Sequence, residues 1–260
     1  MLAITVIVAT ILMIWLATKH WPIRPGEGRE FSNSIDYRSD KTECFTVGTF
    51  NIHRGRGIDG IRSLARISDT ICDCDVVGLQ EVEGYSLRNS KNQAYLLAEY
   101  GQYAVHFSPT RKQLFLPHRG NALLTRYPVS YWCREPLFPT HGKAYRNLTM
   151  YTLQISGQEV HVINTHLSKP TDQNAPLQRV LELFVSLERA VLVGDFNTHA
   201  CHPLIQEITN LQAVDATSLS SEDPNRVDWI LVRGLEIVSA TYIPASASDH
   251  PFYSAELRLM

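Results

Sequence analysis

Residues 191–199 read VLVGDFNTH, an apolar run that stops at Asp195 and Asn197. A short run rich in β-branched residues, followed by polar turn residues, is typical of a buried strand and the loop after it. An acid and an amide placed there lie at the edge of a sheet, where they can bind metal, phosphate or water. The stretch therefore predicts a buried strand that carries part of a functional site at its end.

Five further segments extend this pattern along the chain. In four of them a strand-like run stops at a polar side chain: TFNIH (49–53, with Asn51), GLQEVE (78–83, with Glu81), NTHL (164–167, with His166) and SDHP (248–251, with Asp249 and His250). In the fifth, RVDWIL (226–231), Asp228 stands inside an apolar run, where burying an unpaired charge costs several kcal/mol. Taken singly, most of these residues read as turn, surface or core residues. The complete set predicts one converging site.

Short β-branched or aromatic runs recur along the chain and predict strands over 45–50, 76–79, 103–107, 121–125, 148–155, 160–164, 190–193, 227–232 and 252–259. Helical spacing of apolar residues is confined to 61–71, 95–100 and 180–187. Many strands with few helices between them indicate two packed sheets flanked by helices.

The N-terminus differs in kind, because residues 2–18 (LAITVIVATILMIWLAT) carry no charge. A helix of this length spans about 25 Å, slightly less than a hydrocarbon core of about 30 Å. We expect residues 1–21 to be a transmembrane anchor, with a cleaved signal segment or a buried core helix as the alternatives. Residues 22–43 then form a linker, and residues 44–260 form the globular domain. Lys19, Arg24 and Arg29 follow the segment, and positive charges on that side favour a domain on the cytoplasmic face.

Composition narrows the function class. The 260 residues carry a net charge of −2, so nothing in the overall charge indicates a long nucleic-acid partner. The five cysteines are irregularly spaced, which fits neither a disulfide framework nor a zinc site and indicates plain thiols.

The order Asn after a strand, LQE, THL, GDFN, DW and SDH resembles that of the endonuclease/exonuclease/phosphatase superfamily, over residues 45–257. FNIHRGRGIDG, LQEVE and RGNALLTRYPV are similar to a deoxyribonuclease-like bacterial group of metal-dependent hydrolases in that superfamily. The resemblance implies an α/β four-layer sandwich, in which two mixed β-sheets are flanked by helices and a metal site lies at one end. The N-terminal apolar helix stands outside that sandwich.

By the same resemblance, Asn51 and Glu81 are the metal-binding pair, and Glu81 is the main ligand. Asp249 is either a further metal-side carboxylate or one that orients a histidine. Oxygen donors of this kind suit Mg²⁺ or Mn²⁺ better than zinc, so either ion is the expected cofactor.

The resemblance implies catalytic roles for five residues. Asp195 positions or deprotonates the attacking water, and Asn197 orients that water. Asp228 and His250 form a couple in which the carboxylate fixes the imidazole tautomer and stabilises its cationic form. His166 contacts the scissile phosphate.

Four further residues are candidates for substrate binding: Arg54 in HRGRG, just after Asn51, Arg119 and Asn121 in RGN, and Arg146, which precedes Asn147. Arginine suits phosphate because its planar fork bonds two oxygens. Each arginine is equally compatible with a solvated surface position.

The leading hypothesis is a membrane-anchored, metal-dependent hydrolase of a phosphodiester or phosphomonoester. An anchor over residues 2–18 favours a lipid headgroup or another membrane-proximal ester as the substrate. A Mg²⁺-dependent endonuclease or exonuclease acting on nucleic acid is the first alternative, and a non-catalytic binding protein on the same fold is the second. Oligomeric state is not predicted by the sequence.

Overall fold

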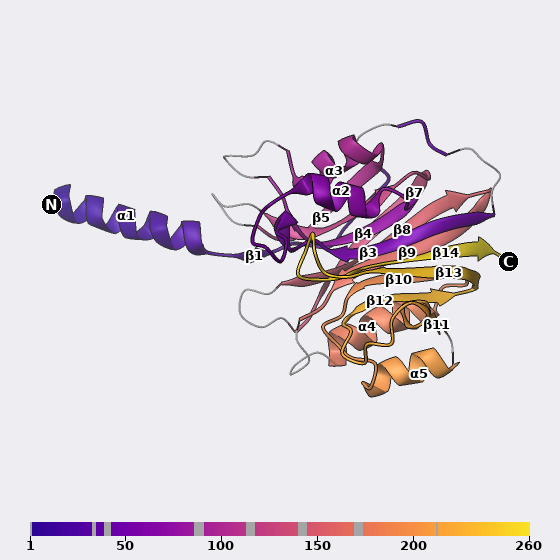
Figure 1. Ribbon diagram of the computed structural model, residues 1–260. Helices are drawn as coiled ribbons and strands as arrows, with labels where there is room; N and C mark the ends of the chain where they lie inside the picture. The colour runs from indigo at the N-terminus through magenta and orange to yellow at the C-terminus, as the bar shows by residue number, and fades with distance from the viewer. Residues whose placement is uncertain are drawn as a thin grey trace.

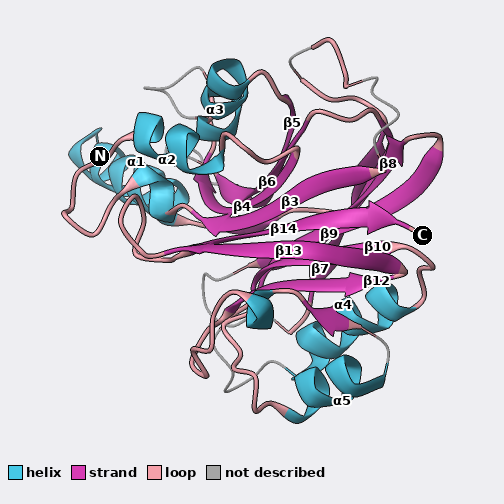
Figure 2. Cartoon of the chain, turned by 45° about the vertical axis from the view of Figure 1, so that its right-hand side comes forward, coloured by secondary structure: helices cyan, strands magenta, loops and turns pink. Residues whose placement is uncertain are grey.

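The computed structural model describes residues 2–32, 35–38, 43–85, 91–112, 118–139, 145–168, 174–211 and 213–260. Two sheets, each of seven strands within these ranges, stack face to face, and helices cover their outer faces (Figures 1 and 2). This is the four-layer sandwich of mixed sheets that the sequence predicts.

The first sheet carries the ends of the TFNIH and GLQEVE segments. Its strands lie in the order β1 (Trp21–Pro22), β5 (Ala104–Lys112), β6 (Arg119–Thr125), β4 (Val76–Glu83), β3 (Cys44–Asn51), β14 (Phe252–Leu259) and β13 (Leu235–Ile243). β3 and β4 are parallel, so their carboxyl ends, with Asn51 and Glu81, reach the same edge.

The second sheet carries the NTHL and VLVGDFNTH segments. Its strands lie in the order β11 (Val214–Asp215), β12 (Asp228–Arg233), β10 (Ala190–Asp195), β9 (Gln158–His166), β8 (Arg146–Ile155), β7 (Val129–Leu137) and β2 (Gly26–Gly28). β9 and β10 are parallel, and β12 runs antiparallel to β10.

The core has three parts that correspond to the three interfaces between layers. Buried residues such as Val47, Val162 and Val193 fill the space between the sheets. A second cluster joins the first sheet to α2 (Leu64–Ile71) and α3 (Gln93–Gly101), and a third joins the second sheet to α4 (Asn174–Val185) and α5 (Pro203–Leu211). Short 3₁₀ turns occur at His53–Gly55 and Thr217–Leu219.

Local signals explain where α2 and α3 begin. The Ser63 hydroxyl accepts the backbone N–H of Arg66 at 3.4 Å, and the Asn92 side chain accepts that of Tyr95 at 2.7 Å. Side-chain oxygens at these positions satisfy N–H groups that the first helical turn leaves unpaired.

Three sizeable elements depart from the sequence prediction. β7 has eight half-buried residues and contains Arg134, Glu135 and Pro136, so it lacks the alternation that marks a strand. β13 is an edge strand whose residues are mostly exposed. α5 was also not predicted, although Leu204, Ile205 and Ile208 have the spacing of one helix face.

The predicted linker over residues 22–43 is partly ordered against the domain. Trp21–Pro22 pairs with β5, and Gly26–Gly28 pairs with β7, so this segment extends one edge of each sheet. Residues 33–34 and 39–42 of the linker lie outside the described residues.

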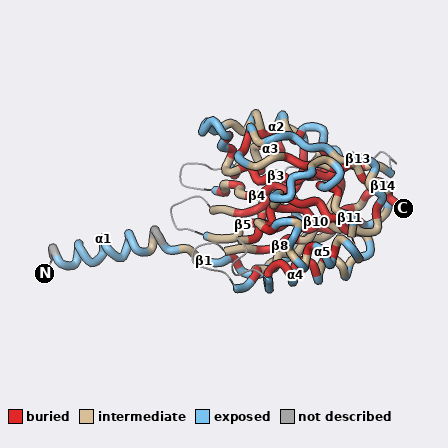
Figure 3. Tube along the Cα trace, turned by 60° about the horizontal axis from the view of Figure 1, so that its bottom comes forward, coloured by how far each residue is buried: buried red, intermediate tan, exposed pale blue. Residues whose placement is uncertain are grey.

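The apolar segment at the N-terminus is helical, as predicted. α1 (Leu2–Thr18) projects from the body of the protein and is exposed along most of its length (Figures 1 and 3). Its apolar side chains, such as Ile7 and Ile11, are therefore in contact with solvent. Within the described residues, no helix is both long enough and apolar enough to cross a membrane. The anchor therefore stays a prediction.

Replacing Gly194 by alanine should destabilise the fold strongly. Gly194 has φ of +147°, and an added Cβ would lie 2.0 Å from the carbonyl oxygen of Thr165 on the neighbouring strand. We expect the free energy of unfolding to fall by about 3 kcal/mol. The matched control is Gly157→Ala, since Gly157 has φ of +79° and open space around it; its cost should be about 1 kcal/mol. Equal losses in urea unfolding of the two variants would contradict the close approach at Gly194.

Candidate active site

Pairing within the second sheet brings three predicted residues side by side. Asp195 at the end of β10 is in register with His166 at the end of β9 and with Asp228 at the start of β12. All three side chains are buried. The register in which the strands pair therefore also places these three polar groups in one row across the sheet.

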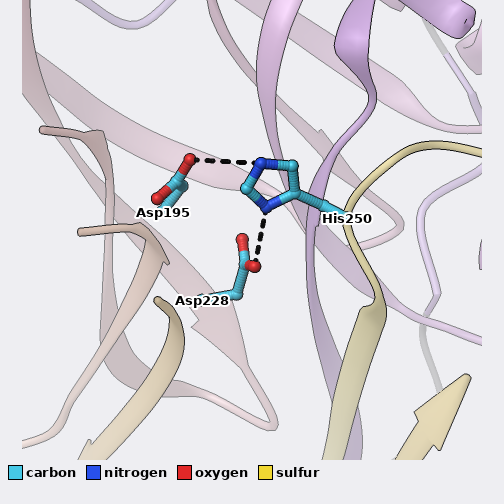
Figure 4. Close-up of side chains that lie close together, drawn as sticks. All are labelled: Asp195, Asp228 and His250. Atoms are coloured by element: carbon cyan, nitrogen blue, oxygen red, sulfur yellow. Dashed lines mark hydrogen bonds and ion pairs between the residues drawn. The ribbon is translucent and has the colours of Figure 1, made fainter. Parts of the chain in front are cut away.

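His250 reaches this row from the loop before β14 and stands between two carboxylates (Figure 4). Its Nδ1 lies 2.8 Å from Oδ2 of Asp228, and its Nε2 lies 3.7 Å from Oδ2 of Asp195. Asp228 thus bonds one ring nitrogen and directs the other toward Asp195.

Asn51 links the first sheet to this cluster. Its Nδ2 donates to Oδ2 of Asp195 at 3.0 Å and lies 3.4 Å from Nε2 of His250. The hydroxyl of Ser248 donates to the Asn51 carbonyl at 2.6 Å, which ties the loop carrying His250 to the end of β3. One amide thus joins both halves of the site.

Asn197 lies beside Asp195 in a left-handed conformation, with φ of +48°. Its backbone N–H donates to Oδ1 of Asp195 at 2.8 Å, and its side-chain amide donates to the carbonyl of Leu167 at 3.0 Å. Its Nδ2 also lies 3.3 Å from Nε2 of His166. A non-glycine residue at positive φ is held there by its surroundings, and such positions cluster at functional sites.

The surroundings raise the pKa values of Asp195, Asp228 and His250, each for its own reason. Burial, and next the charge of Asp228, raise the pKa of Asp195 to about 6. Burial also raises the pKa of Asp228. Burial opposes the charge on His250, but its bond to Asp228 and the charges of Asp228 and Asp195 outweigh that effect and raise its pKa to about 9. His250 is therefore cationic at neutral pH.

His166 has the opposite character. Burial, followed by the charges of Arg146 and His250, lowers its pKa well below the ordinary value. Its Nε2 lies 3.3 Å from Oδ2 of Asp195, and because the ring is neutral this contact is not an ion pair. The site thus contains one charged and one neutral imidazole.

Glu81 stands at a break in β4. The pairing of β4 with β6 shifts register between Leu79 and Val82, and Glu81 has φ of +55°. A bulge of this kind re-aims a side chain out of the alternation of the strand. The Glu81 carboxylate faces a cavity of about 360 Å³, lined by Glu81, Thr110, Arg111, Arg119, Gly120, Asn121, Tyr145, Arg146 and His166.

Asp249 lies at the rim of the site. Its Oδ1 is 3.2 Å from Nδ1 of His53 and accepts from the Ser248 hydroxyl at 3.2 Å, and half of the side chain is exposed. The resemblance left open whether Asp249 serves a metal or orients a histidine, and the histidine it contacts is His53.

The four candidates for substrate binding are spread around the cavity. Arg119, Asn121 and Arg146 line it, and Arg54 lies outside its lining with Nε 4.0 Å from the Glu81 carboxylate. Sequence reasoning missed Arg111, which also lines the cavity. The sequence around it, SPTRKQ, carries no motif, and only the pairing of β5 with β6 brings it here.

The donor set suits a divalent cation that prefers oxygen. Glu81 is a partly exposed carboxylate aimed into the cavity, and Asn51 Oδ1 accepts only the backbone N–H of His53 among the described residues, at 3.1 Å. Asp195, Asp228 and His250 also bring ligand atoms within 4.8 Å of one another and are a possible divalent-metal site. The 2.8 Å bond between Asp228 and His250 occupies one atom of each. Asn51 and Glu81 therefore fit a cation better.

Comparison with known proteins gives a family match over most of the chain. The sequence profile of the Endonuclease/Exonuclease/phosphatase family matches residues 48–250. A curated relative, "Uncharacterized protein YbhP" of Escherichia coli (strain K12), is 28% identical over 262 residues, which cover 85% of this chain and 99% of that protein.

Two solved structures illustrate the shared fold. The endonuclease/exonuclease/phosphatase from Beutenbergia cavernae DSM 12333 has a TM-score of 0.68 at 23% identity, over 83% of this chain and 72% of that chain. A mannosyl-6-phosphatase from Bacteroides thetaiotaomicron VPI-5482 has a TM-score of 0.63 at 18% identity, over 82% and 99%.

Proposed function

Because this chain belongs to the endonuclease/exonuclease/phosphatase family, we propose that it is a divalent-metal-dependent hydrolase of a phosphodiester or phosphomonoester. The observation that carries the proposal is the junction at Asp195, where the two sheets meet. Its Oδ2 is approached by Asn51 and His250 from the first sheet and its loops, and by His166 from the second sheet.

Asp195 is the base in this proposal. Its pKa, raised to about 6, lies close to the pH at which an enzyme works, which suits a group that must accept a proton from water. The amide of Asn51 and the backbone N–H of Asn197 hold its two oxygens in place. A water molecule bonded to Asp195 would be aligned for attack on phosphorus, with Asn197 orienting it.

The two histidines have different tasks. Cationic His250, held by Asp228, stabilises negative charge that develops on the phosphoryl oxygens. Neutral His166 faces the cavity and contacts the scissile phosphate. A fixed charge in a site with little water stabilises the transition state more than it would in solvent.

Asn51 and Glu81 would hold Mg²⁺ or Mn²⁺. The ion, when bound, polarises a phosphoryl oxygen and neutralises charge on the leaving group. The name of the Bacteroides relative, a mannosyl-6-phosphatase, supports phosphate-ester chemistry on this fold.

A panel of esters tests the proposal. The full chain, purified in detergent, should hydrolyse at least one of bis(p-nitrophenyl) phosphate, p-nitrophenyl phosphate, sphingomyelin and plasmid DNA with Mg²⁺ or Mn²⁺. A chelator should stop turnover, and added metal should restore it. The plasmid arm distinguishes the nuclease alternative from small or lipid esters. Absence of turnover on every substrate with either ion would favour the non-catalytic alternative.

We also propose that α1 holds the protein at a membrane, with the globular domain on the cytoplasmic face. The motivation is the exposed apolar surface of this helix, which a globular protein rarely leaves uncovered. The full chain should sediment with membranes and resist carbonate washing. The double variant Ile7→Asp/Ile11→Asp should move to the supernatant, while Ile7→Leu/Ile11→Leu should stay with the membrane. Release of the unaltered chain by carbonate would contradict the proposal.

A further inference from the structure

The cavity beside the proposed reaction centre extends well beyond it. Arg119 on β6 is in register with Glu83 on β4 and with Arg111 on β5, so the two arginines stand side by side. Arg146, at the start of β8 in the other sheet, lines the same cavity. The three arginines thus share one cavity with Glu81 and His166.

The arginines of this cavity lie close enough for their positive charges to act on one another. Burial, followed by the charges of Arg119 and Arg146, lowers the pKa of Arg111. Burial, and next the charge of Arg54, lower that of Arg119. Within the described part of the chain, neither Arg119 nor Arg146 forms an ion pair with a carboxylate, although Arg146 donates to the Ser168 hydroxyl at 3.1 Å. Desolvated cations held together in this way create a field that favours a bound anion.

One scissile phosphate does not account for all three arginines. Arg111 and Glu81 lie on strands separated by β6, and neighbouring strands are about 4.8 Å apart, so the strands that carry them are about 10 Å apart. A phosphate at Glu81 and His166 leaves Arg111 facing a different part of the substrate, and Arg119 lies on the strand between the two positions. Arginine forks bind both phosphate and carboxylate through paired N–H groups.

We propose that Arg111, Arg119 and Arg146 form a subsite for a second acidic group of the substrate, a phosphate or carboxylate within about 10 Å of the scissile phosphorus. This rests on the proposed function, and it narrows the substrate from any phosphoester to one that carries two anionic groups.

The subsite lies where the apolar helix joins the domain. β1, which follows α1, pairs with β5 so that Pro22 is opposite Arg111 and Trp21 is opposite Lys112. The Tyr145 hydroxyl, at the cavity wall, donates to the carbonyl of His20 at 3.5 Å. The same two-anion chemistry can therefore come from a phosphorylated lipid headgroup or from a soluble bisphosphate.

A matched pair of chromogenic esters tests the subsite on the full chain with Mn²⁺. The pair is thymidine 5′-(p-nitrophenyl phosphate) with and without a 3′-phosphate. The unaltered protein should prefer the 3′-phosphorylated ester about tenfold or more in kcat/KM, and Arg111→Met should lower that ratio about tenfold. Arg258→Gln, at the far end of β14 and paired with Glu236, should keep the ratio. No preference in the unaltered protein, or a ratio unchanged in Arg111→Met, overturns the subsite.

A binding arm decides the matter if neither ester is turned over; the proposed function fails only if the panel of esters is also not hydrolysed. Calorimetry with inorganic pyrophosphate should show about tenfold weaker binding to Arg111→Met than to the unaltered chain or Arg258→Gln. Equal binding by all three proteins overturns the subsite.

Vesicles distinguish the two sources of the anion. Phosphatidylcholine vesicles containing phosphatidylinositol are compared with vesicles containing a phosphatidylinositol monophosphate. The measured quantity is the amount of protein that sediments with each kind of vesicle. Stronger binding to the vesicles with the monophosphate that is lost in Arg111→Met supports the subsite with a headgroup as its ligand. Preference for the second acidic group among soluble esters only supports the subsite with a soluble ligand.

Discussion

Replacing Asp195 by asparagine should lower turnover about 10³-fold and leave the fold intact. The amide has nearly the same shape but cannot take a proton from water, so the proposed base is lost. Asparagine loses one of the two hydrogen bonds that Asp195 accepts, but removing a buried charge beside Asp228 offsets that loss, so the midpoint of thermal unfolding should change little. Turnover of the best ester in the panel and thermal unfolding are the two measurements.

The matched control for this variant is Asp69→Asn, on the exposed face of α2. It makes the same chemical change far from the site and should keep full activity. If Asp195→Asn retained turnover within a few-fold of the unaltered protein, Asp195 would not be the base, and His250 would become the candidate for that role.

The second large effect concerns Glu81. Replacing it by glutamine should raise the Mg²⁺ or Mn²⁺ concentration needed for half-maximal turnover about tenfold or more, because affinity for hard cations follows the number of charged ligands. Turnover should recover in part at high metal concentration. A metal titration of the rate measures both quantities.

Glu83→Gln is the control for Glu81, since Glu83 lies on the same strand and pairs with Arg62 at 3.1 Å. The metal requirement of this variant should not change.

The titration also distinguishes the two possible metal positions. Asp228→Asn should reduce the rate at every metal concentration if Asp228 serves His250, whereas a shifted metal requirement would place the ion among Asp195, Asp228 and His250.

Residues at the ends of regular strands were the easiest part of the site to predict. Asn51, His166 and Asp195 each follow a buried run, and parallel pairing of β3 with β4 and of β9 with β10 brings such ends to one edge. The buried position of Asp228 had a second signal, because an acid inside an apolar run requires a partner. That partner is His250.

Features that depend on pairing between distant strands could not be predicted. The bulge that turns Glu81 into the cavity arises from a register shift against β6, which leaves no mark in GLQEVE. Arg111 joins the cavity through the pairing of β5 with β6. The contact of Asp249 with His53 depends on two loops that are nearly 200 residues apart in the chain.

Strands that lack a clear face were missed for a related reason. β13 lies at the edge of the first sheet with most of its residues exposed, so burial imposes no alternation on its sequence. β10 is buried along its whole length and was predicted. Strand prediction from sequence therefore succeeded where both faces of a strand are covered.

The most direct test of the central claim is hydrolysis in H₂¹⁸O with Mn²⁺, using the ester of the panel that is turned over fastest. If water attacks phosphorus at Asp195, the phosphate product should carry one ¹⁸O atom per cleaved bond. Labelling should stop with chelator and fall in parallel with turnover in Asp195→Asn. Label found in the released alcohol instead, or labelled phosphate formed at full rate by Asp195→Asn, would contradict the account.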